Sequence, residues 1–269
     1  KATDDTVSVL EVSRGQHIIA KKILDENNGN FTTHPTISSG LLMSPDCTNF
    51  AWIVSDKLKF EQKNEELDFT TKMYEYKDYG EDMDGIYHTS LVVYDTKTNE
   101  AKVYGSPEGF GACQFAFASN NVIIIQCVDI RSPRLLGLRS YTNRLFEIYA
   151  VKLDEETPVF VNLLGPKRLD PSVYLIDEKS CILFTQKFPE HFGGHNGQLH
   201  PEVCRVDLEK LTISDLRTHT VALNLEKTAE NIFLNENEVV LTESNRGLYI
   251  PVVLNLSTFE TRELIKRES

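Results

Sequence analysis

Residues 90–104 read SLVVYDTKTNEAKVY, and this stretch decides how the rest of the chain is interpreted. The flanking segments, Ser90–Tyr94 and Ala101–Tyr104, are rich in the β-branched and aromatic residues that are typical of strands. Between them, Asp95-Thr96-Lys97-Thr98-Asn99 supplies the polar residues of a turn. The stretch therefore predicts a β-hairpin with an acidic corner.

Similar corners recur along the chain. They are Leu153-Asp154-Glu155-Glu156, Asp207-Leu208-Glu209-Lys210 and Asn255-Leu256-Ser257-Thr258. Their starts, at residues 95, 153, 207 and 255, lie about 50 residues apart, which is close to the repeat of a β-propeller blade. We therefore expect each corner to belong to one structural repeat.

Strand signals dominate the remaining sequence. Val7–Val12 is expected to pair with Ile18–Ile23, and further strands are expected at Val122–Val128, Glu147–Leu153, Pro158–Val161, Cys181–Gln186, Glu202–Val206, Val239–Glu243 and Tyr249–Leu254. No segment keeps the apolar period of a helix over 12 or more positions, and Phe60–Met73 is expected to be a loop or a short helix. The prediction is an almost all-β protein.

These strands group into blades. Residues 6–24 resemble the outer hairpin of an incomplete blade, and residues 40–105, 112–164, 170–222 and 230–265 resemble four fuller blades. We predict a single β-propeller domain, or a fragment of one, over residues 1–269, with four to five four-stranded blades from a ring of seven or eight. A small closed propeller and a β-sandwich with long loops are the alternatives.

Composition excludes several classes of partner. The 269 residues carry a net charge of −12, which argues against nucleic acid or an anionic membrane as the main partner. No apolar stretch approaches the roughly 20 residues of a membrane-spanning helix, and no signal peptide is visible. Five widely spaced cysteines without a Cys-x-x-Cys pair favour a reducing, cytoplasmic location. Two glycosylation sequons, at Asn30 and Asn255, weakly oppose that location.

Catalytic motifs are missing from the sequence. None of the 14 glycines is followed two positions later by serine, so the nucleophile elbow of a serine hydrolase is absent, and no glycine precedes lysine as in a Walker loop. Gly109-Phe110-Gly111 lacks the third glycine of a dinucleotide loop, so an inter-blade turn is favoured. We expect no catalytic residue, metal or cofactor in this chain, and we expect His191, His195 and His200 to belong to a solvated loop.

Two clusters could contact a ligand or a neighbouring domain. Asp78, Tyr79 and Glu81 combine carboxylates with an aromatic ring and could hold a cationic group. The alternative is a hydrated acidic loop, which would have the same residue pattern. Arg139 and Arg144, in a group with Arg131, Arg134 and Tyr141, could receive a carboxylate or stack on a ring. The alternative is that these arginines form inter-blade ion pairs with the acidic loops.

The sequence resembles a known family at several places. Leu136-Gly137-Leu138-Arg139-Ser140-Tyr141-Thr142-Asn143-Arg144, followed by Ile148–Val151, is similar to part of the propeller of acylaminoacyl-peptidases, in the prolyl oligopeptidase group of serine peptidases. The loop Asp78–Glu81 with Leu91–Asp95 after it, the hairpin around Leu10–Val12, and the turn at Asn245 are similar to further segments of that propeller. The similarity runs in order over residues 7–265. Tyr141 and Tyr79 depart from it, because the family has Cys and Trp there.

The resemblance implies a function for a larger protein. In that family a seven- or eight-bladed propeller caps an α/β-hydrolase domain, whose Ser–Asp–His triad releases N-acylated amino acids from short blocked peptides. By the order of motifs, this chain would be a non-catalytic propeller portion that lacks the hydrolase domain. It would gate short N-acylated peptides and dock on the catalytic domain, with Asp78, Tyr79, Glu81, Arg139 and Arg144 facing the channel or the interface. The alternative is a stand-alone propeller scaffold for protein–protein interaction. A homo-oligomer is a further expectation, because a partial ring leaves strand edges exposed.

Overall fold

The computed structural model describes residues 8–14, 17–24, 30–31, 37–38, 40–57, 86–131, 146–166, 168–175, 177–187, 200–218, 222–224, 233–235, 237–245 and 248–264. All regular secondary structure in these ranges is β-strand, as the sequence predicts, and every strand pair is antiparallel. Within the same ranges no helix is long and apolar enough to cross a membrane. The segment Phe60–Met73 lies outside them.

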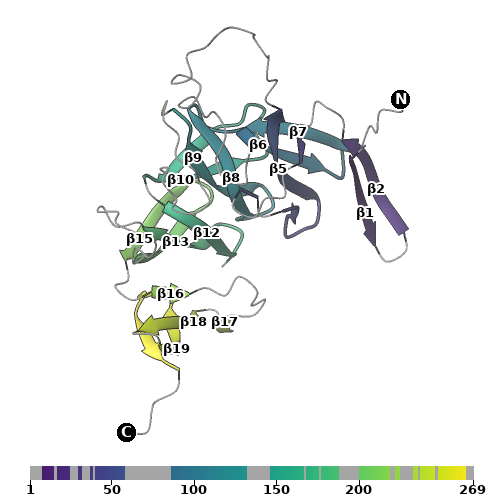
Figure 1. Cartoon of the computed structure of the whole chain (residues 1–269). Helices are drawn as coiled ribbons and strands as arrows, with labels where there is room; N and C mark the ends of the chain where they lie inside the picture. Colours follow the sequence, from purple (N-terminus) through teal and green to yellow (C-terminus); the bar gives the residue numbers. More distant parts are fainter. Residues whose placement is uncertain are drawn as a thin grey trace, which may run out of the picture.

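Each sheet is built from strands that follow one another in the sequence, an arrangement typical of propeller blades. Blade 1 contains β4 (Leu42–Met43), β5 (Asn49–Lys57), β6 (Ile86–Asp95) and β7 (Glu100–Gly105). Blade 2 contains β8 (Phe110–Phe117), β9 (Val122–Asp129), β10 (Phe146–Lys152) and β11 (Phe160–Leu164). The order within both sheets confirms the predicted repeat (Figure 1).

Blades 3 and 4 repeat the pattern. Blade 3 contains β12 (Arg168–Leu175), β13 (Ser180–Lys187), β14 (His200–Asp207) and β15 (Thr212–Thr218). Blade 4 contains β17 (Phe233–Asn235), β18 (Glu238–Asn245), β19 (Leu248–Asn255) and β20 (Thr261–Glu263). Two short strands, β3 (Asn30–Phe31) and β16 (Ala222–Asn224), extend the first strand of blades 1 and 4, since they pair with the far halves of β5 and β18.

The predicted half-blade is a separate two-stranded hairpin. Strand β1 (Ser8–Arg14) pairs with β2 (His17–Leu24). This hairpin packs on the outer face of blade 1 through Leu10, which joins a cluster with the following core residues: Phe50, Trp52, Val54, Val92 and Tyr94. The sheets follow one another along a curve from the hairpin to blade 4, as the blades of a β-propeller do, with the hairpin and blade 4 at its two ends (Figure 1).

One hydrogen bond recurs in all four blades and defines the repeat. We call the turn between the first and second strands corner A and the turn between the third and fourth strands corner B. The last residue of corner A accepts, at its carbonyl, the backbone N–H of a residue in corner B. The four pairs are Thr96 to Thr48 (2.9 Å), Leu153 to Asn121 (2.8 Å), Leu208 to Lys179 (2.8 Å) and Leu256 to Asn237 (2.7 Å). The bond confirms the predicted repeat of corners. In blade 2, however, the residue equivalent to Asp95 is Lys152, so this corner starts one residue earlier than the predicted start at Leu153.

Side chains cap these corners for a simple reason. An Asp, Asn or Ser accepts the N–H of the second residue after it, which is an Asx or ST turn. In corner A the acceptors are Asp46, Ser119, Asp177 and Asn235. In corner B they are Asp95, Asp207 and Asn255. The polar corner residues that the sequence shows are thus the ones that satisfy the turn backbone.

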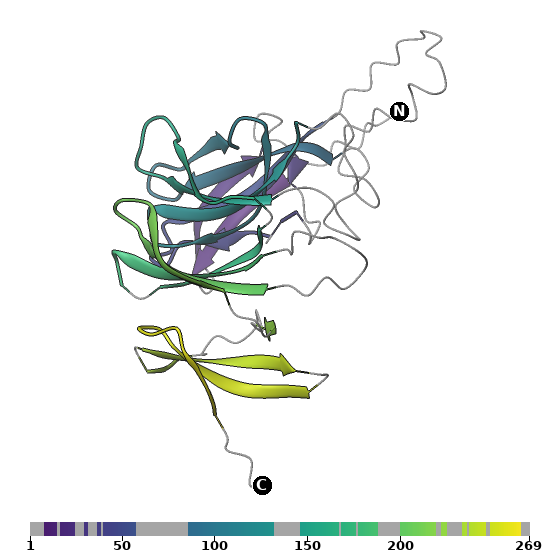
Figure 2. The ribbon, with the colours of Figure 1, turned by 90° about the vertical axis from the view of Figure 1, so that its left-hand side faces the viewer.

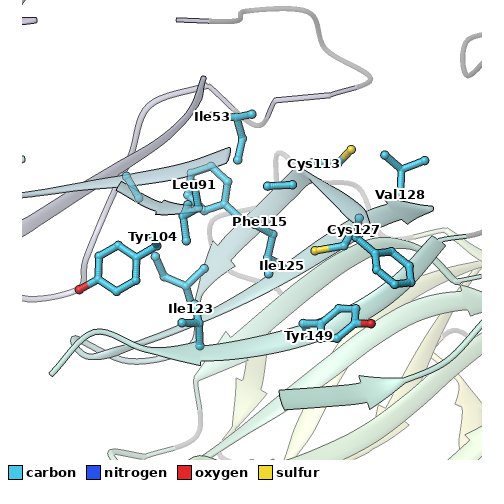
Figure 3. Close-up of a cluster of buried hydrophobic side chains, with 14 of the residues drawn as sticks. Ile53, Leu91, Tyr104, Cys113, Phe115, Ile123, Ile125, Cys127, Val128 and Tyr149 are labelled. Carbon is cyan, nitrogen blue, oxygen red and sulfur yellow. The ribbon is translucent and has the colours of Figure 1, made fainter. Parts of the chain in front are cut away.

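Every pair of neighbouring sheets has its own hydrophobic core, because successive residues of a strand point to opposite faces. Blades 1 and 2 enclose a cluster that includes Ile53, Leu91, Phe115, Ile125 and Tyr149 (Figure 3). Blades 2 and 3 enclose Ile124, Ile148, Leu183 and Val206, among others. Blades 3 and 4 enclose Phe184, Val203, Leu241 and Leu254, among others. The apolar runs found in the sequence therefore serve two interfaces each.

Cations strengthen the contacts between consecutive blades. Lys102 Nζ donates to the carbonyls of Glu155 (3.1 Å) and Glu156 (2.8 Å) in corner B of blade 2. Lys152 Nζ donates to the carbonyl of Glu209 (2.8 Å) in corner B of blade 3. Each of these two corners thus receives a lysine from the blade before it.

Candidate functional site

The strands that precede and follow the predicted site residues meet at one end of the sheets. Asp78, Tyr79 and Glu81 belong to the connection between β5 and β6, and Arg139 and Arg144 belong to the connection between β9 and β10; all five lie outside the described residues. Both connections join the second strand of a blade to the third. The strand ends that flank them therefore lie at the end opposite the corners, which we call the loop end. The segment with His191 and His195, which lies outside the described residues, joins β13 to β14 at this end as well. His200 is the first residue of β14, opposite Lys187, so the prediction of a loop is wrong for this residue.

A charged and aromatic cluster occupies the loop end of blade 2. Arg131 binds Asp129 at two points, with Nε 3.0 Å from Oδ1 and Nη2 2.6 Å from Oδ2. The Arg131 guanidinium also lies over the Phe110 ring, 4.7 Å from its centroid. The Arg131 side-chain hydrogen bond holds the pKa of Asp129 below its usual value, so this pair stays charged at neutral pH. Among the described residues Arg131 pairs within its own blade; the acidic loop at residues 77–82 lies outside them, so the alternative of inter-blade pairing stays a prediction.

The turn before β8 makes room for this arrangement. Gly109 has φ +77°, and a Cβ atom there would lie 2.5 Å from Arg131 Cδ. The carbonyl of Gly109 also accepts the N–H of Ile130 at 3.0 Å. Gly109 and Phe110 thus form an inter-blade turn, as the incomplete glycine motif predicts, and that turn supports Arg131.

A second carboxylate lies beside the first cluster. Glu147, at the start of β10, accepts hydrogen bonds from the Tyr149 hydroxyl (2.8 Å) and from Asn162 Nδ2. Burial, and then the bond to Glu147, raises the pKa of Tyr149 to about 12. Tyr149 packs edge-on against Phe110, with ring centroids 5.6 Å apart. Phe110 therefore connects the ion pair to the Glu147 group.

The same position carries a glutamate in blade 3. Glu147-Ile148-Tyr149-Ala150-Val151 and Glu202-Val203-Cys204-Arg205-Val206 align when the corners are superposed. Glu202 is buried and accepts a hydrogen bond from Thr218 Oγ1 on the fourth strand at 3.3 Å, as Glu147 does from Asn162. Sequence reasoning missed both glutamates, although the shared Glu-x-x-x-Val spacing before a corner is a signal that could have found them.

The clusters around Arg131, Glu147 and Glu202 combine carboxylates held by hydrogen-bond donors, an arginine in an ion pair and two aromatic rings, which are groups that can bind charged or aromatic partners. Among the described residues, no group of three His, Cys, Asp or Glu side chains could hold a metal ion. Four of the five cysteines are buried, and burial raises the pKa of Cys127 and, to about 12, that of Cys181. Those two thiols are therefore poor nucleophiles at neutral pH.

Comparison with known proteins gives structural likeness alone. No family model matches the sequence, and no curated protein matches it either. An oligogalacturonate lyase from Vibrio parahaemolyticus is 12% identical, with a TM-score of 0.49 over 85% of this chain and 53% of the lyase. An acylaminoacyl peptidase from Pyrococcus horikoshii is 9% identical, with a TM-score of 0.48 over 86% of this chain and 32% of the peptidase.

A third similar structure is the β-propeller domain of the Trilobed protease from Pyrococcus furiosus, at 9% identity and a TM-score of 0.48 over 87% of this chain and 58% of that domain. The chain thus spans about half the length of the lyase and about a third of the peptidase. At these identities the likeness assigns no activity to this chain.

Proposed function

We propose that this chain is the propeller portion of an acylaminoacyl-peptidase-like serine hydrolase. One observation carries the proposal: the segments that resemble the family follow the order of the structural units. The Leu10–Val12 segment lies in the hairpin, Leu91–Asp95 in blade 1, Ile148–Val151 in blade 2 and Asn245 in blade 4. These segments also keep the order that they have in the propeller of the family, over residues 7–265.

The proposed role is to admit short N-acylated peptides and to dock on a catalytic α/β-hydrolase domain in the cytoplasm. Connections between second and third strands attach at the loop end of blades 1, 2 and 3, and the connection of blade 2 follows the Asp129–Arg131 pair directly and ends beside Glu147. Asp78, Tyr79, Glu81, Arg139 and Arg144 are the proposed gating or interdomain residues. Charged and aromatic groups suit this role, because they can sort peptides by charge and size without reacting with them.

The proposal is tested on the protein as cells make it. An antibody raised against this chain is used to isolate every polypeptide that carries the sequence. The isolate is treated with a fluorophosphonate probe, which labels active serine hydrolases, and assayed for release of an N-acetylated amino acid from an N-acetylated tripeptide. We expect labelling of a polypeptide larger than 30.6 kDa and release of the acylated residue.

The gating role is then tested separately. In the active protein, Glu81→Ala should change kcat/KM for a short acylated peptide by about tenfold relative to a longer one. Glu156→Ala is the control, because Glu156 is exposed in corner B, at the opposite end of the sheets, and only its backbone carbonyl is used. Equal effects of the two substitutions would remove residues 78–81 from the gate.

A stand-alone scaffold is the rival function. It is supported by the charged and aromatic groups of the loop end, such as the Asp129–Arg131 pair and Phe110, which suit contact with a protein partner as well as with a peptide. If no polypeptide carrying the sequence is labelled by the probe or releases acylated residues, the peptidase proposal is wrong and the scaffold stands.

A further inference from the structure

Arg131 is an exposed side chain that is nevertheless held in one position. It follows β9 at the loop end of blade 2; Figure 2 shows the loop end of the sheets on the right and the corners on the left. The side chain is 60% exposed, yet its guanidinium is bound to Asp129 and lies over Phe110. An arginine that is already ordered loses less conformational entropy when a ligand binds to it.

One edge of this guanidinium is occupied and another edge is open. Nε donates to Asp129 Oδ1 and Nη2 donates to Asp129 Oδ2, which uses two of the five N–H bonds of an arginine side chain. Among the described residues, no second acceptor binds the remaining N–H bonds of this group. Nη1 and Nη2 therefore form an edge with two parallel N–H bonds, which is the geometry that binds both oxygens of a carboxylate or two oxygens of a phosphate.

The ring of Phe110 fixes the plane of the open edge. The guanidinium lies 4.7 Å from the ring centroid, and the ring itself is buried and packs edge-on against Tyr149. Gly109 has no side chain in the space that the stem of Arg131 occupies. Because Phe110, Gly109 and Asp129 constrain the side chain from different sides, the open edge is held in a defined orientation, and a ligand must approach it in the plane of the guanidinium.

The neighbouring charges decide which anion suits this edge. Asp129, and more weakly Glu147, raise the pKa of Arg131 above its usual value, so the guanidinium stays charged. When all three side chains are ionised, they carry one net negative charge together. A dianionic phosphate would be repelled about twice as strongly as a carboxylate, which has one charge and two oxygens in one plane. The edge therefore favours a monocarboxylate, with a weak Kd of about 1 mM.

We propose that the open edge of Arg131 binds the α-carboxylate of a short peptide. The inference rests on the proposed function, because that function brings short N-acylated peptides to the loop end. An aspartate or glutamate side chain of a docked domain is the other source of the same group, and the test separates the two sources. A peptide anchored here by its C-terminus would reach a catalytic serine only if its length matched the distance, so Arg131 would add a length limit to the gate.

The binding test uses the 269-residue chain and ligand-observed NMR, with an N-acetylated alanine tripeptide as the probe. We expect the free acid to bind with a Kd of about 1 mM and the C-terminal amide to bind about tenfold more weakly or not at all. Arg131→Lys should weaken binding of the acid by about fivefold or more, since lysine keeps the charge but lacks the planar edge. Arg262→Lys is the matched control, because Arg262 is 56% exposed and paired with Glu238 but lies at the corner end of blade 4.

Several outcomes of this test would overturn the assignment. They are equal binding of the acid and the amide, equal losses in Arg131→Lys and Arg262→Lys, and tighter binding of inorganic phosphate than of the acid. A tripeptide amide that carries a glutamate side chain is the last probe. If it binds as well as the free acid, the α-carboxylate is not the ligand, and a docked domain is favoured as the source of the carboxylate.

Kinetics separate this site from the proposed function. In the active protein, Arg131→Lys should raise KM for the acid by about fivefold and leave KM for the amide unchanged. Binding of the acid by a chain whose polypeptides show no hydrolase activity would keep the carboxylate site and remove the proposed function. Hydrolase activity with the same KM for the acid and the amide would keep the proposed function and remove the site.

Discussion

The guanidinium of Arg131 lies 4.7 Å from the centroid of the Phe110 ring, while its Nη2 is 2.6 Å from Asp129 Oδ2. Phe110 begins blade 2 and Asp129 ends its second strand, so this side chain ties together two strands at the loop end. The arrangement requires Gly109, because any side chain there would occupy the space of the Arg131 stem.

Gly109→Ala should destabilise the fold by two separate effects. A positive φ costs an alanine about 1 kcal/mol, and the new Cβ must displace Arg131 from Phe110. Gly105→Ala is the matched control, because Gly105 has φ +80° and no atom within 4 Å of the added Cβ. In urea unfolding, Gly109→Ala should lose about 1 kcal/mol more than Gly105→Ala, and the excess should vanish when Arg131→Ala is also present. Equal losses would show that Arg131 moves aside freely.

Tyr149 should make stability depend on alkaline pH. Its pKa is raised to about 12 in the folded chain, chiefly by burial, while an unfolded tyrosine titrates near 10. A raised folded pKa means that this contribution is complete below pH 10 and is lost as the pH rises toward 12. The wild type should therefore lose more unfolding free energy than Tyr149→Phe between pH 10 and 12. Parallel curves for the two proteins would contradict this assignment.

Two of the corner leucines, Leu208 and Leu256, should be important for stability because each is buried between two sheets. Leu208 donates its N–H in the recurring corner bond and packs in the core between blades 2 and 3. Leu208→Ala should cost about 2–4 kcal/mol in chemical denaturation. Leu216→Ala, at a position 40% exposed on β15, should cost about 0.5 kcal/mol or less. A small decrease in unfolding free energy for Leu208→Ala would mean that the neighbouring side chains move in to fill the cavity.

The cysteines should differ sharply in reactivity. Cys47 is exposed, whereas Cys113, Cys127, Cys181 and Cys204 are buried. A disulfide-exchange reagent at pH 8 should titrate one thiol in the native protein and five in denaturant. Cys47→Ser should abolish the fast native reaction. Rapid modification of a second thiol would show that a blade interface opens readily.

Much of the fold could be predicted because local signals coincide with the repeat. Apolar runs such as Val122–Val128 and corners such as Asp207–Lys210 have strong propensities, and both lie where the sheets need them. Of the strands with seven or more residues, β5, β8, β12 and β15 were not predicted. Strands β8 and β12 contain register shifts, at Ala112/Phe115 and Leu169/Ser172, which break the alternating pattern. Strand β15 is largely exposed and so carries no apolar signal.

The loop end was harder to predict. The proposed gating residues were chosen for their charges and for a family resemblance, and residues 78, 79, 81, 139 and 144 stay predictions. Glu147 and Glu202 were not predicted as site residues, because a single glutamate within an apolar strand is typical of an ordinary surface position. Their importance depends on the neighbouring fourth strand, which places Asn162 and Thr218 beside them. Such pairing is long-range and leaves little trace in the local sequence.

The separation of the hydrophobic cores has a mechanical consequence. Among the described residues, each apolar cluster joins two neighbouring sheets. The opening of one sheet should therefore destabilise the next sheet through a single interface, and more distant sheets only through those between. Within the described ranges, the hairpin and blade 4 each share an apolar cluster with one other sheet, so in the 269-residue chain we expect them to open before the middle blades. Amide exchange should therefore be slowest in β9 and β10 and faster toward both ends, in a gradient that a single indivisible core would not produce.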